Sequence, residues 1–288
     1  MDGPFLYLNT STGVDNTHKK IRTPEAPSLV VIDKATGRYV ARDDEAIAPR
    51  IFHCTWSSPA LAEVNGERRL FFAGGNGMLY AFRPLPTNAP PPAGVTKLEK
   101  VWQFDFDPAG PKEDVHRFNG NRRESPSNFY GMPVFHESAI YLAGGGDMYW
   151  GKNEAWLKCI DATGRGDVSG TAERWSHPLE KHTIGTPAIQ DGLVYVTDIG
   201  RTLHCVDTRT GELCWSHEAR GDFWASPLVA DGKVYVGSRR GDFWVLAAGR
   251  EKRVLAEIAL GEPVNATAVA ANGTLYVATM SRLLAVSR

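Results

Sequence analysis

Residues 225–236 read ASPLVADGKVYV, and the same pattern returns as GTPAIQDGLVYV at 185–196 and as ATAVAANGTLYV at 266–277. Each copy is separated from the next by 40 or 41 residues. In every copy a short apolar run is followed by Asp-Gly or Asn-Gly, the residues that accept positive φ in a tight hairpin turn. A Val-Tyr-Val type strand comes next, and its β-branched and aromatic side chains suit a pleated, half-buried surface. The pattern predicts an antiparallel hairpin that repeats along the chain.

Two further strands complete each repeat. The third strand follows a second turn, as in residues 203–206 and 243–246, and a fourth closes the unit, as in residues 100–104. Earlier copies begin at Ser58 and Met132, with longer steps because loops are inserted between the strands. Four short strands in about 40 residues are typical of one β-propeller blade. We therefore predict an all-β fold, a β-propeller of four-stranded antiparallel blades.

The repeats predict one propeller domain over residues 1–288 with about six blades, the first and last incomplete. The approximate blade bounds are 3–44, 57–105, 131–179, 185–219, 225–260 and 265–288. The first repeat starts at the turn Asp2-Gly3, without an innermost strand, and the last lacks a fourth strand. Because these deficits do not complement each other, we expect a truncated portion of a longer chain. The alternative is a six-bladed ring with ragged ends. A truncated ring exposes a strand edge, which favours self-association.

The composition is that of a packed globular domain. Hydrophobic residues make up 42% and charged residues 23% of the chain. Lys plus Arg (32) nearly equals Asp plus Glu (33), so we expect no nucleic-acid partner, which usually requires a basic excess. No apolar run approaches the roughly 18 residues of a membrane span, and the first residues do not resemble a secretory signal peptide. The cysteines form no CxxC pair, which leaves zinc-ribbon and thioredoxin-type chemistry unsupported.

The turn between the third and fourth strands carries a second signature. Residues 205–215 read CVDTRTGELCW, residues 31–38 read VIDKATGR, and residues 160–164 read IDATG, with Trp175 later. These stretches resemble the A-x-D-x-x-T-G-x-x-x-W repeat of PQQ-like, quinoprotein-type β-propellers, in which the Trp packs between blades. The resemblance covers essentially the whole chain. The repeat is similar to that of PQQ-like bacterial envelope proteins, including the propeller lipoprotein of the outer-membrane assembly machine. It implies a periplasmic or secreted protein.

The resemblance also brings a cofactor into question. Quinoprotein dehydrogenases of this fold hold PQQ with a calcium ion, carboxylate and Asn ligands, an Arg, a stacking Trp and often a disulfide between adjacent cysteines. No two cysteines of this chain are adjacent, and no Glu/Asn/Asp calcium set can be matched to a blade. No cofactor is therefore predicted, and PQQ with calcium stays an alternative without matched ligands. The histidines show no HxH or HExxH spacing, and no metal site is predicted.

Long loops supply the candidate binding residues. Histidines are candidate ligand contacts, arginines are candidate anion contacts, and tryptophans can stack on a sugar or a quinone. The candidate ligand-binding residues are His18, His53, Trp56, Arg117, Arg122, Arg123, Asp147, Trp150, His182 and Trp224. Each group has a plainer alternative: solvated histidines, arginines paired with nearby acidic residues, and tryptophans that wedge adjacent blades.

Catalytic residues stay unassigned, because no GxSxG elbow and no nucleophile with a recognisable partner occurs. The glycine-rich stretches 74–77 and 144–146 lack the Lys-Ser/Thr of a phosphate loop and are interpreted as hairpin turns. The first hypothesis is a binding or scaffold module that holds a protein partner, a saccharide or an anionic ligand on the long-loop face around the central channel. The alternative is an enzyme using the same face, either a quinone-dependent dehydrogenase or a hydrolase acting on an ester or glycoside.

Overall fold

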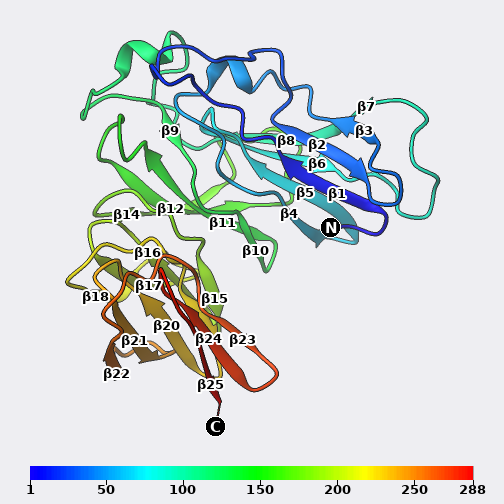
Figure 1. Cartoon of the computed structure of the whole chain (residues 1–288). Helices are drawn as coiled ribbons and strands as arrows, with labels where there is room; N and C mark the ends of the chain where they lie inside the picture. Colours follow the sequence, from blue (N-terminus) through cyan, green and yellow to red (C-terminus); the bar gives the residue numbers. More distant parts are fainter. Residues whose placement is uncertain (288) are drawn as a thin grey trace. The chain divides into compact units, whose positions relative to one another are not determined.

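The computed structural model describes residues 1–287, and its regular structure is almost entirely β (Figure 1). The strands form six sheets, three of them four-stranded and the others of three or five strands, with antiparallel neighbours along the chain. This confirms the predicted fold class. Two short 3-10 helices, η1 (Ala48–Arg50) and η2 (Val115–Phe118), lie in connecting loops. Within residues 1–287, none of the helices has the length and apolar character needed to cross a membrane.

The first three sheets contain the insertions that lengthen the early repeats. The first sheet has the order β1 (Phe5–Asn9), β2 (Leu29–Asp33), β3 (Tyr39–Arg42) and β7 (Thr96–Lys97). The second has the order β13 (Gly166–Asp167), β8 (Glu99–Asp105), β6 (Met78–Arg83), β5 (Glu67–Ala73) and β4 (Ala60–Val64). The third has the order β10 (Val134–His136), β11 (Ala139–Gly146), β12 (Ala155–Asp161) and β14 (Glu173–Leu179), and β9 (Ser127–Asn128) also pairs with β11.

The last three sheets follow the 40-residue repeat closely. The fourth sheet has the order β15 (Ala188–Gln190), β16 (Leu193–Thr197), β17 (Thr202–Asp207) and β18 (Leu213–Glu218). The fifth has the order β19 (Leu228–Ala230), β20 (Lys233–Gly237), β21 (Asp242–Ala247) and β22 (Val254–Ala259). The sixth has three strands, β23 (Val269–Ala271), β24 (Thr274–Ala278) and β25 (Leu283–Ser287). The predicted lack of a fourth strand in the last repeat is thus confirmed for the described residues.

The hairpin turns form where Asp-Gly and Asn-Gly predict them. Between β19 and β20, Asp231 has φ 51° and Gly232 has φ 66°, both in the left-handed region that this turn type needs. The interpretation of residues 74–77 as a turn is confirmed, but that of residues 144–146 is wrong. Residues 144–146 end strand β11 and are buried there. A Cβ on Gly146 would lie 2.1 Å from the carbonyl oxygen of Lys152, so glycine allows another segment to approach the strand closely.

Two sheets gain, at an edge, a parallel two-residue strand that the repeat did not predict. β7 pairs in parallel with β3, and β13 pairs in parallel with β8. In each case the added strand comes from a later part of the chain and covers the outer edge of the sheet. A covered edge has fewer free backbone groups for pairing with another chain.

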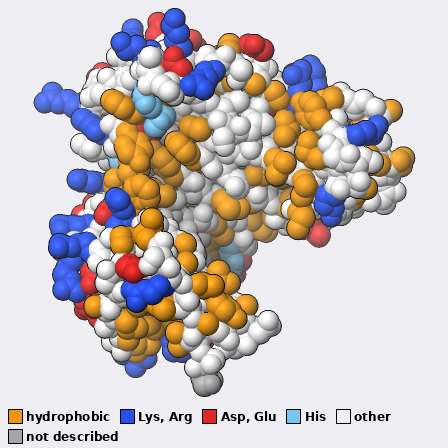
Figure 2. All heavy atoms as spheres, viewed as in Figure 1, with side chains coloured by type: hydrophobic (Ala, Val, Ile, Leu, Met, Phe, Trp, Pro, Cys, Tyr) orange, Lys and Arg blue, Asp and Glu red, His pale blue; other side chains and the backbone are white. Residues whose placement is uncertain are grey.

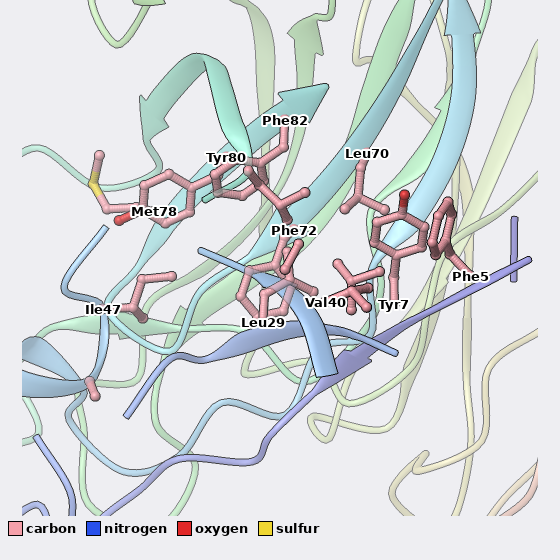
Figure 3. Packing of buried hydrophobic residues seen from close by; sticks show 14 of the residues in the cluster. Phe5, Tyr7, Leu29, Val40, Ile47, Leu70, Phe72, Met78, Tyr80 and Phe82 are labelled. Atoms are coloured by element: carbon pink, nitrogen blue, oxygen red, sulfur yellow. The ribbon is translucent and has the colours of Figure 1, made fainter. Parts of the chain in front are cut away.

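The chain divides into two compact units, each with its own apolar core. The first unit comprises residues 1–140, 144–153 and 160–174, and the second comprises residues 141–143, 154–159 and the chain from Trp175 onward. In the first unit, a cluster of fully buried side chains joins residues of the first two sheets (Figure 3). Its members include Phe5, Leu29, Val40, Leu70, Phe72, Tyr80 and Phe82. A single propeller domain over the whole chain stays a prediction.

Tryptophans on the last strand of three sheets bond to backbone carbonyls of later segments. The Trp175 indole N–H donates to the Thr208 carbonyl over 2.9 Å, and Trp215 donates to the Gly249 carbonyl over 2.8 Å. Trp102 donates to the Ala162 carbonyl over 3.1 Å. Thr208 lies in the D-x-x-T-G turn of residues 207–211 and Ala162 in the shortened D-x-T-G turn of residues 161–164, so the two halves of the repeat signature stabilise each other.

Candidate functional site

The Asp147 carboxylate lies at the centre of a buried polar network in the first unit. Asp147 directly follows strand β11, and its side chain is fully buried. Its Oδ1 accepts the backbone N–H groups of Tyr149 and Trp150, each over 2.9 Å. Its Oδ2 accepts the Tyr130 hydroxyl over 2.6 Å and lies 2.9 Å from His53 Nδ1. Four donors therefore surround one carboxylate, which is how a buried charge is made tolerable.

These contacts decide which groups of the network are charged. Burial alone raises the pKa of Asp147, but the hydrogen bonds from His53 and Tyr130 outweigh it and hold that pKa below its usual value. Burial and the neighbouring Asp147 charge raise the pKa of Tyr130 strongly. Asp147 is therefore ionised and Tyr130 protonated at neutral pH. Because an ionised carboxylate only accepts, the proton in the His53–Asp147 bond resides on His53 Nδ1.

Aromatic rings enclose the imidazole of His53. The His18 ring lies 4.9 Å from it edge-on, the Trp56 ring 5.6 Å and the Tyr149 ring 6.0 Å, measured between ring centroids. Trp56 in turn stacks on Tyr130 at 5.7 Å. We call His18, His53, Trp56, Tyr130, Asp147, Tyr149 and Trp150 the His53 cluster. Its rings restrict the imidazole to one orientation.

The loop at residues 10–26 is held against His53 by backbone hydrogen bonds. The Val14 N–H donates to the His53 carbonyl over 2.8 Å, and the Thr55 N–H donates to the Thr12 carbonyl over 2.9 Å. Gly13 forms an isolated β-bridge with Cys54, and a Cβ on Gly13 would lie 2.7 Å from the His53 carbonyl oxygen. Glycine at this position is therefore what allows the loop to lie so close to residues 53–55.

A pocket of about 460 Å³ opens between this loop and the His53 cluster. Hydroxyl groups, one acidic residue, one arginine and the Trp56 ring line it. The lining residues used below are Thr10, Asp15, Arg22, His53, Cys54 and Trp56. Trp56 keeps 43% of its surface exposed, although its neighbours are aromatic. We call this the Trp56 pocket. It combines a flat apolar face with polar groups of fixed direction, the usual make-up of a small-ligand site.

Five of the ten predicted site residues meet in this cluster. They are His18, His53, Trp56, Asp147 and Trp150. A sixth, Arg122, supports it from behind, because its guanidinium donates to the carbonyls of Met148, Tyr149 and Gly151. Arg122 therefore holds the loop that follows Asp147 rather than a ligand anion.

The other four candidates lie elsewhere. Arg117 is on η2 with its guanidinium 4.8 Å from the Phe118 ring centroid, and Arg123 is exposed. His182 is buried in the second unit, where its carbonyl accepts the Ile199 N–H. Trp224, also in the second unit, donates to Asp222 and packs against the Arg239 guanidinium at 4.3 Å.

Sequence reasoning missed two parts of the site. Tyr149 was outside the predicted set, although it lies on the long loop at residues 143–156. The hydroxyl-bearing residues 10–12 were also outside it, although they begin the first long loop. Loop length was the available signal, and it does not tell which side chains of a loop converge.

The described residues do not fit a PQQ and calcium site of the quinoprotein type. All four cysteines are free, so no disulfide between adjacent cysteines exists. Across residues 1–287, no three His, Cys, Asp or Glu side chains are grouped as metal ligands. His18 and His53 do lie together, but the ring nitrogen of His116 bonds instead to the Ile51 carbonyl over 3.1 Å. No step is therefore assigned to this cofactor.

The chain is similar in sequence or structure to several known proteins. The family described as outer membrane protein assembly factor BamB matches residues 153–288. The crystal structure of BamB from Moraxella catarrhalis superimposes with a TM-score of 0.61 at 13% identity, covering 99% of this chain and 67% of that chain. The computationally designed Ika8 protein superimposes with a TM-score of 0.56 at 11% identity, covering 89% of this chain and 64% of the designed one. At such identities, the structural matches show the fold.

A curated relative adds sequence similarity in one region. The quinohemoprotein alcohol dehydrogenase of Comamonas testosteroni is 31% identical over 108 residues. The match covers 33% of this chain and spans 15% of the length of that enzyme. Six sheets, the D-x-x-T-G turns with their tryptophan contacts, and these matches agree. The chain has the fold of PQQ-like β-propeller repeat proteins, and over residues 153–288 it is similar to the BamB family.

Proposed function

We propose that this chain is a binding module whose ligand is held in the Trp56 pocket of the first unit. The observation that carries the proposal is the buried Asp147 carboxylate, which fixes His53 in one orientation on the pocket wall. Side chains that are already ordered lose little freedom when a ligand binds, and this favours affinity.

The size and lining of the pocket favour a polar organic ligand. Its volume of about 460 Å³ lies in the usual range of small-ligand sites. The exposed Trp56 indole offers a flat surface on which a sugar ring or another planar group can stack. The hydroxyl-bearing residues 10–12 also line the pocket. A saccharide, or an anionic group carried by a protein partner, has both features.

The resemblance to an outer membrane protein assembly factor supports a proposal for the cellular location of this module. On that resemblance, we place the chain in the bacterial cell envelope, on the periplasmic side. A protein partner or an envelope saccharide is then the source of the ligand. The fold by itself supplies no ligand identity, because propellers host many unrelated functions.

Indole NMR signals test the proposal directly. The chain has eight tryptophans, and Trp56→Phe identifies the Nε1–H signal of Trp56. We expect saturable movement of that signal with at least one member of a panel of neutral oligosaccharides, acidic oligosaccharides and short peptides. Trp56→Ala should weaken binding about tenfold or more, since a stacked aromatic anchor is lost. Trp224→Ala, in the second unit, is the matched control. Binding that Trp56→Ala leaves unchanged, or a Trp56 signal that no ligand moves, refutes the proposal.

A second candidate function is hydrolysis in the same pocket. The favouring observation is the 2.9 Å contact between His53 Nδ1 and Asp147, the arrangement in which a carboxylate orients a histidine base. Burial raises the pKa of the neighbouring Cys54 thiol to about 11, so that thiol is a poor nucleophile at neutral pH. Water is then the attacking group. It adds to the carbonyl carbon of an ester while His53 Nε2 takes its proton, and the alcohol leaves with that proton.

Chromogenic acyl esters test this second function. His53→Gln should lower the rate by about 10²-fold or more if His53 is the base. His136→Gln, a substitution outside the pocket, measures the background that any surface histidine gives. Equal rates for the His53→Gln and wild-type proteins refute hydrolysis at this site and leave the binding proposal standing.

A further inference from the structure

His53 contributes a hydrogen-bond acceptor to the Trp56 pocket. Nδ1 of His53 carries the proton that binds Asp147, so in the neutral imidazole Nε2 has a lone pair. Within residues 1–287, His53 Nε2 has no hydrogen-bond partner and is not among the buried unpaired atoms, so it is open to solvent. His53 therefore presents a hydrogen-bond acceptor to the pocket that it lines.

Other atoms on the pocket wall also accept. The Thr10 hydroxyl donates its proton to the Pro27 carbonyl over 2.7 Å, which leaves lone pairs for a ligand. Asp15 adds a carboxylate. Its pKa is lowered by the hydrogen bond from the Thr17 hydroxyl, so Asp15 is ionised at neutral pH. Three different residues thus offer acceptors, and a ligand that matches them must bring donors.

The charge of the pocket is balanced. Apart from the two histidines, the charged side chains among the described residues that line it are Asp15 and Arg22. Arg22 already donates to the Asn16 side chain over 3.1 Å. One positive and one negative side chain leave no net attraction for an anion, and Asp15 repels one. An uncharged ligand avoids this repulsion.

We infer that the Trp56 pocket selects an uncharged, polyhydroxylated ring compound, a neutral saccharide, which stacks on Trp56 and donates a hydroxyl proton to His53 Nε2. The inference rests on the proposed function, because it names the ligand class of the same pocket. The proposed function leaves open whether the ligand is neutral or anionic. The inference decides between the two: neutral saccharides bind well, whereas acidic saccharides and anionic partners bind poorly.

Paired ligands test the inference with the unaltered protein. Binding of neutral oligosaccharides, of their uronic-acid or sulfated counterparts and of their O-methylated forms is measured by calorimetry near pH 8, where an ordinary histidine is neutral. We expect the acidic counterparts to bind about tenfold or more weakly than the neutral ones. O-methylation should have a similar effect, because a methylated oxygen cannot donate and leaves the acceptors unpaired.

Asp147→Asn tests the role of the tautomer. The side-chain amide that this substitution introduces can donate to His53 Nδ1, which moves the imidazole proton to Nε2 and turns that atom from acceptor to donor. We expect the variant to lose part of the preference for neutral saccharides over their O-methylated forms, because a methylated oxygen can accept the proton that Nε2 then carries. Circular dichroism checks that the variant folds, and His53→Phe, which removes the acceptor altogether, supplies the same test if it does not.

The outcomes are distinct. Equal or tighter binding of acidic or O-methylated saccharides overturns the inference, and so does the absence of any neutral-saccharide binding up to about 10 mM. The proposed function still holds after either result if another ligand shifts the Trp56 NMR signal and if Trp56→Ala weakens the binding of that ligand. If no ligand moves that signal, the proposed function fails as well.

Discussion

The buried carboxylate of Asp147 lies 2.9 Å from Nδ1 of His53, a residue 94 positions earlier in the chain. The same oxygen accepts the Tyr130 hydroxyl, and the other oxygen holds the turn at residues 147–150. One side chain thereby joins three loops of the first unit and determines the orientation of an imidazole. On the face drawn in Figure 2, the Lys and Arg side chains lie in several separate groups.

Tyr130→Phe should destabilise the first unit by about 1–3 kcal/mol. The substitution removes a short hydrogen bond to an ionised, fully buried carboxylate, and such bonds contribute more than neutral ones. Tyr149→Phe is the matched control, because Tyr149 is 46% exposed and contacts Asp147 through its backbone. Denaturant titrations compare the two. Equal free energies of unfolding for both variants would show that the Tyr130 hydroxyl contributes nothing.

Lys152→Met should cost about 3–5 kcal/mol of stability. Lys152 Nζ lies 2.7 Å from Asp107 Oδ2, and both side chains are 6% exposed. Removing the ammonium takes away the cation in direct contact with a buried carboxylate, which keeps the Ser127 hydroxyl as a donor and Lys112 as a nearby positive charge. The double variant Lys152→Met with Asp107→Asn should recover part of the loss. A single variant as stable as the wild type contradicts the expectation.

Gly146→Ala should destabilise the protein by about 1–3 kcal/mol through a steric clash. The added Cβ would lie 2.1 Å from the Lys152 carbonyl oxygen, and backbone has little room to move there. Gly170→Ala is the control, since a Cβ at Gly170 meets nothing within 4 Å. Thermal melts of the two variants measure the difference. The expectation fails if both melt at the wild-type temperature.

Glu262 should make stability depend on pH in the acid range. Hydrogen bonds from the Thr279 and Ser281 side chains lower its pKa from 4.5 to about 2. The folded state therefore binds this proton more weakly than the unfolded state, and the contribution is fully present above pH 4.5 and is lost as the pH falls toward 2. Glu262→Gln should thus melt below the wild type at neutral pH, with a gap that closes on acidification. A gap that stays constant from pH 7 to pH 2 contradicts this assignment.

Five of the ten predicted site residues lie in the His53 cluster, and all five are on loops. His, Trp and Asp residues on long loops are good candidates because such side chains rarely occur there without contacts. Four of them, His18, His53, Trp56 and Trp150, meet around the fifth, Asp147. His182 and Trp224 have the same residue types but lie in the second unit. Residue type does not distinguish these cases, because the path of a non-repeating loop is set by contacts with distant segments.

The repeating strands were determined by the sequence itself. Strand, turn and strand lie within about 12 residues of each other, and Asp231-Gly232 selects the hairpin through backbone conformation alone. The parallel strands β7 and β13, the burial of residues 144–146 in β11, and the pairing of Asp147 with His53 were decided by the tertiary structure. Each of these joins segments that are far apart in the chain. Such contacts depend on packing and on hydrogen-bond partners that no local pattern encodes, whereas a hairpin carries its partners within its own short segment.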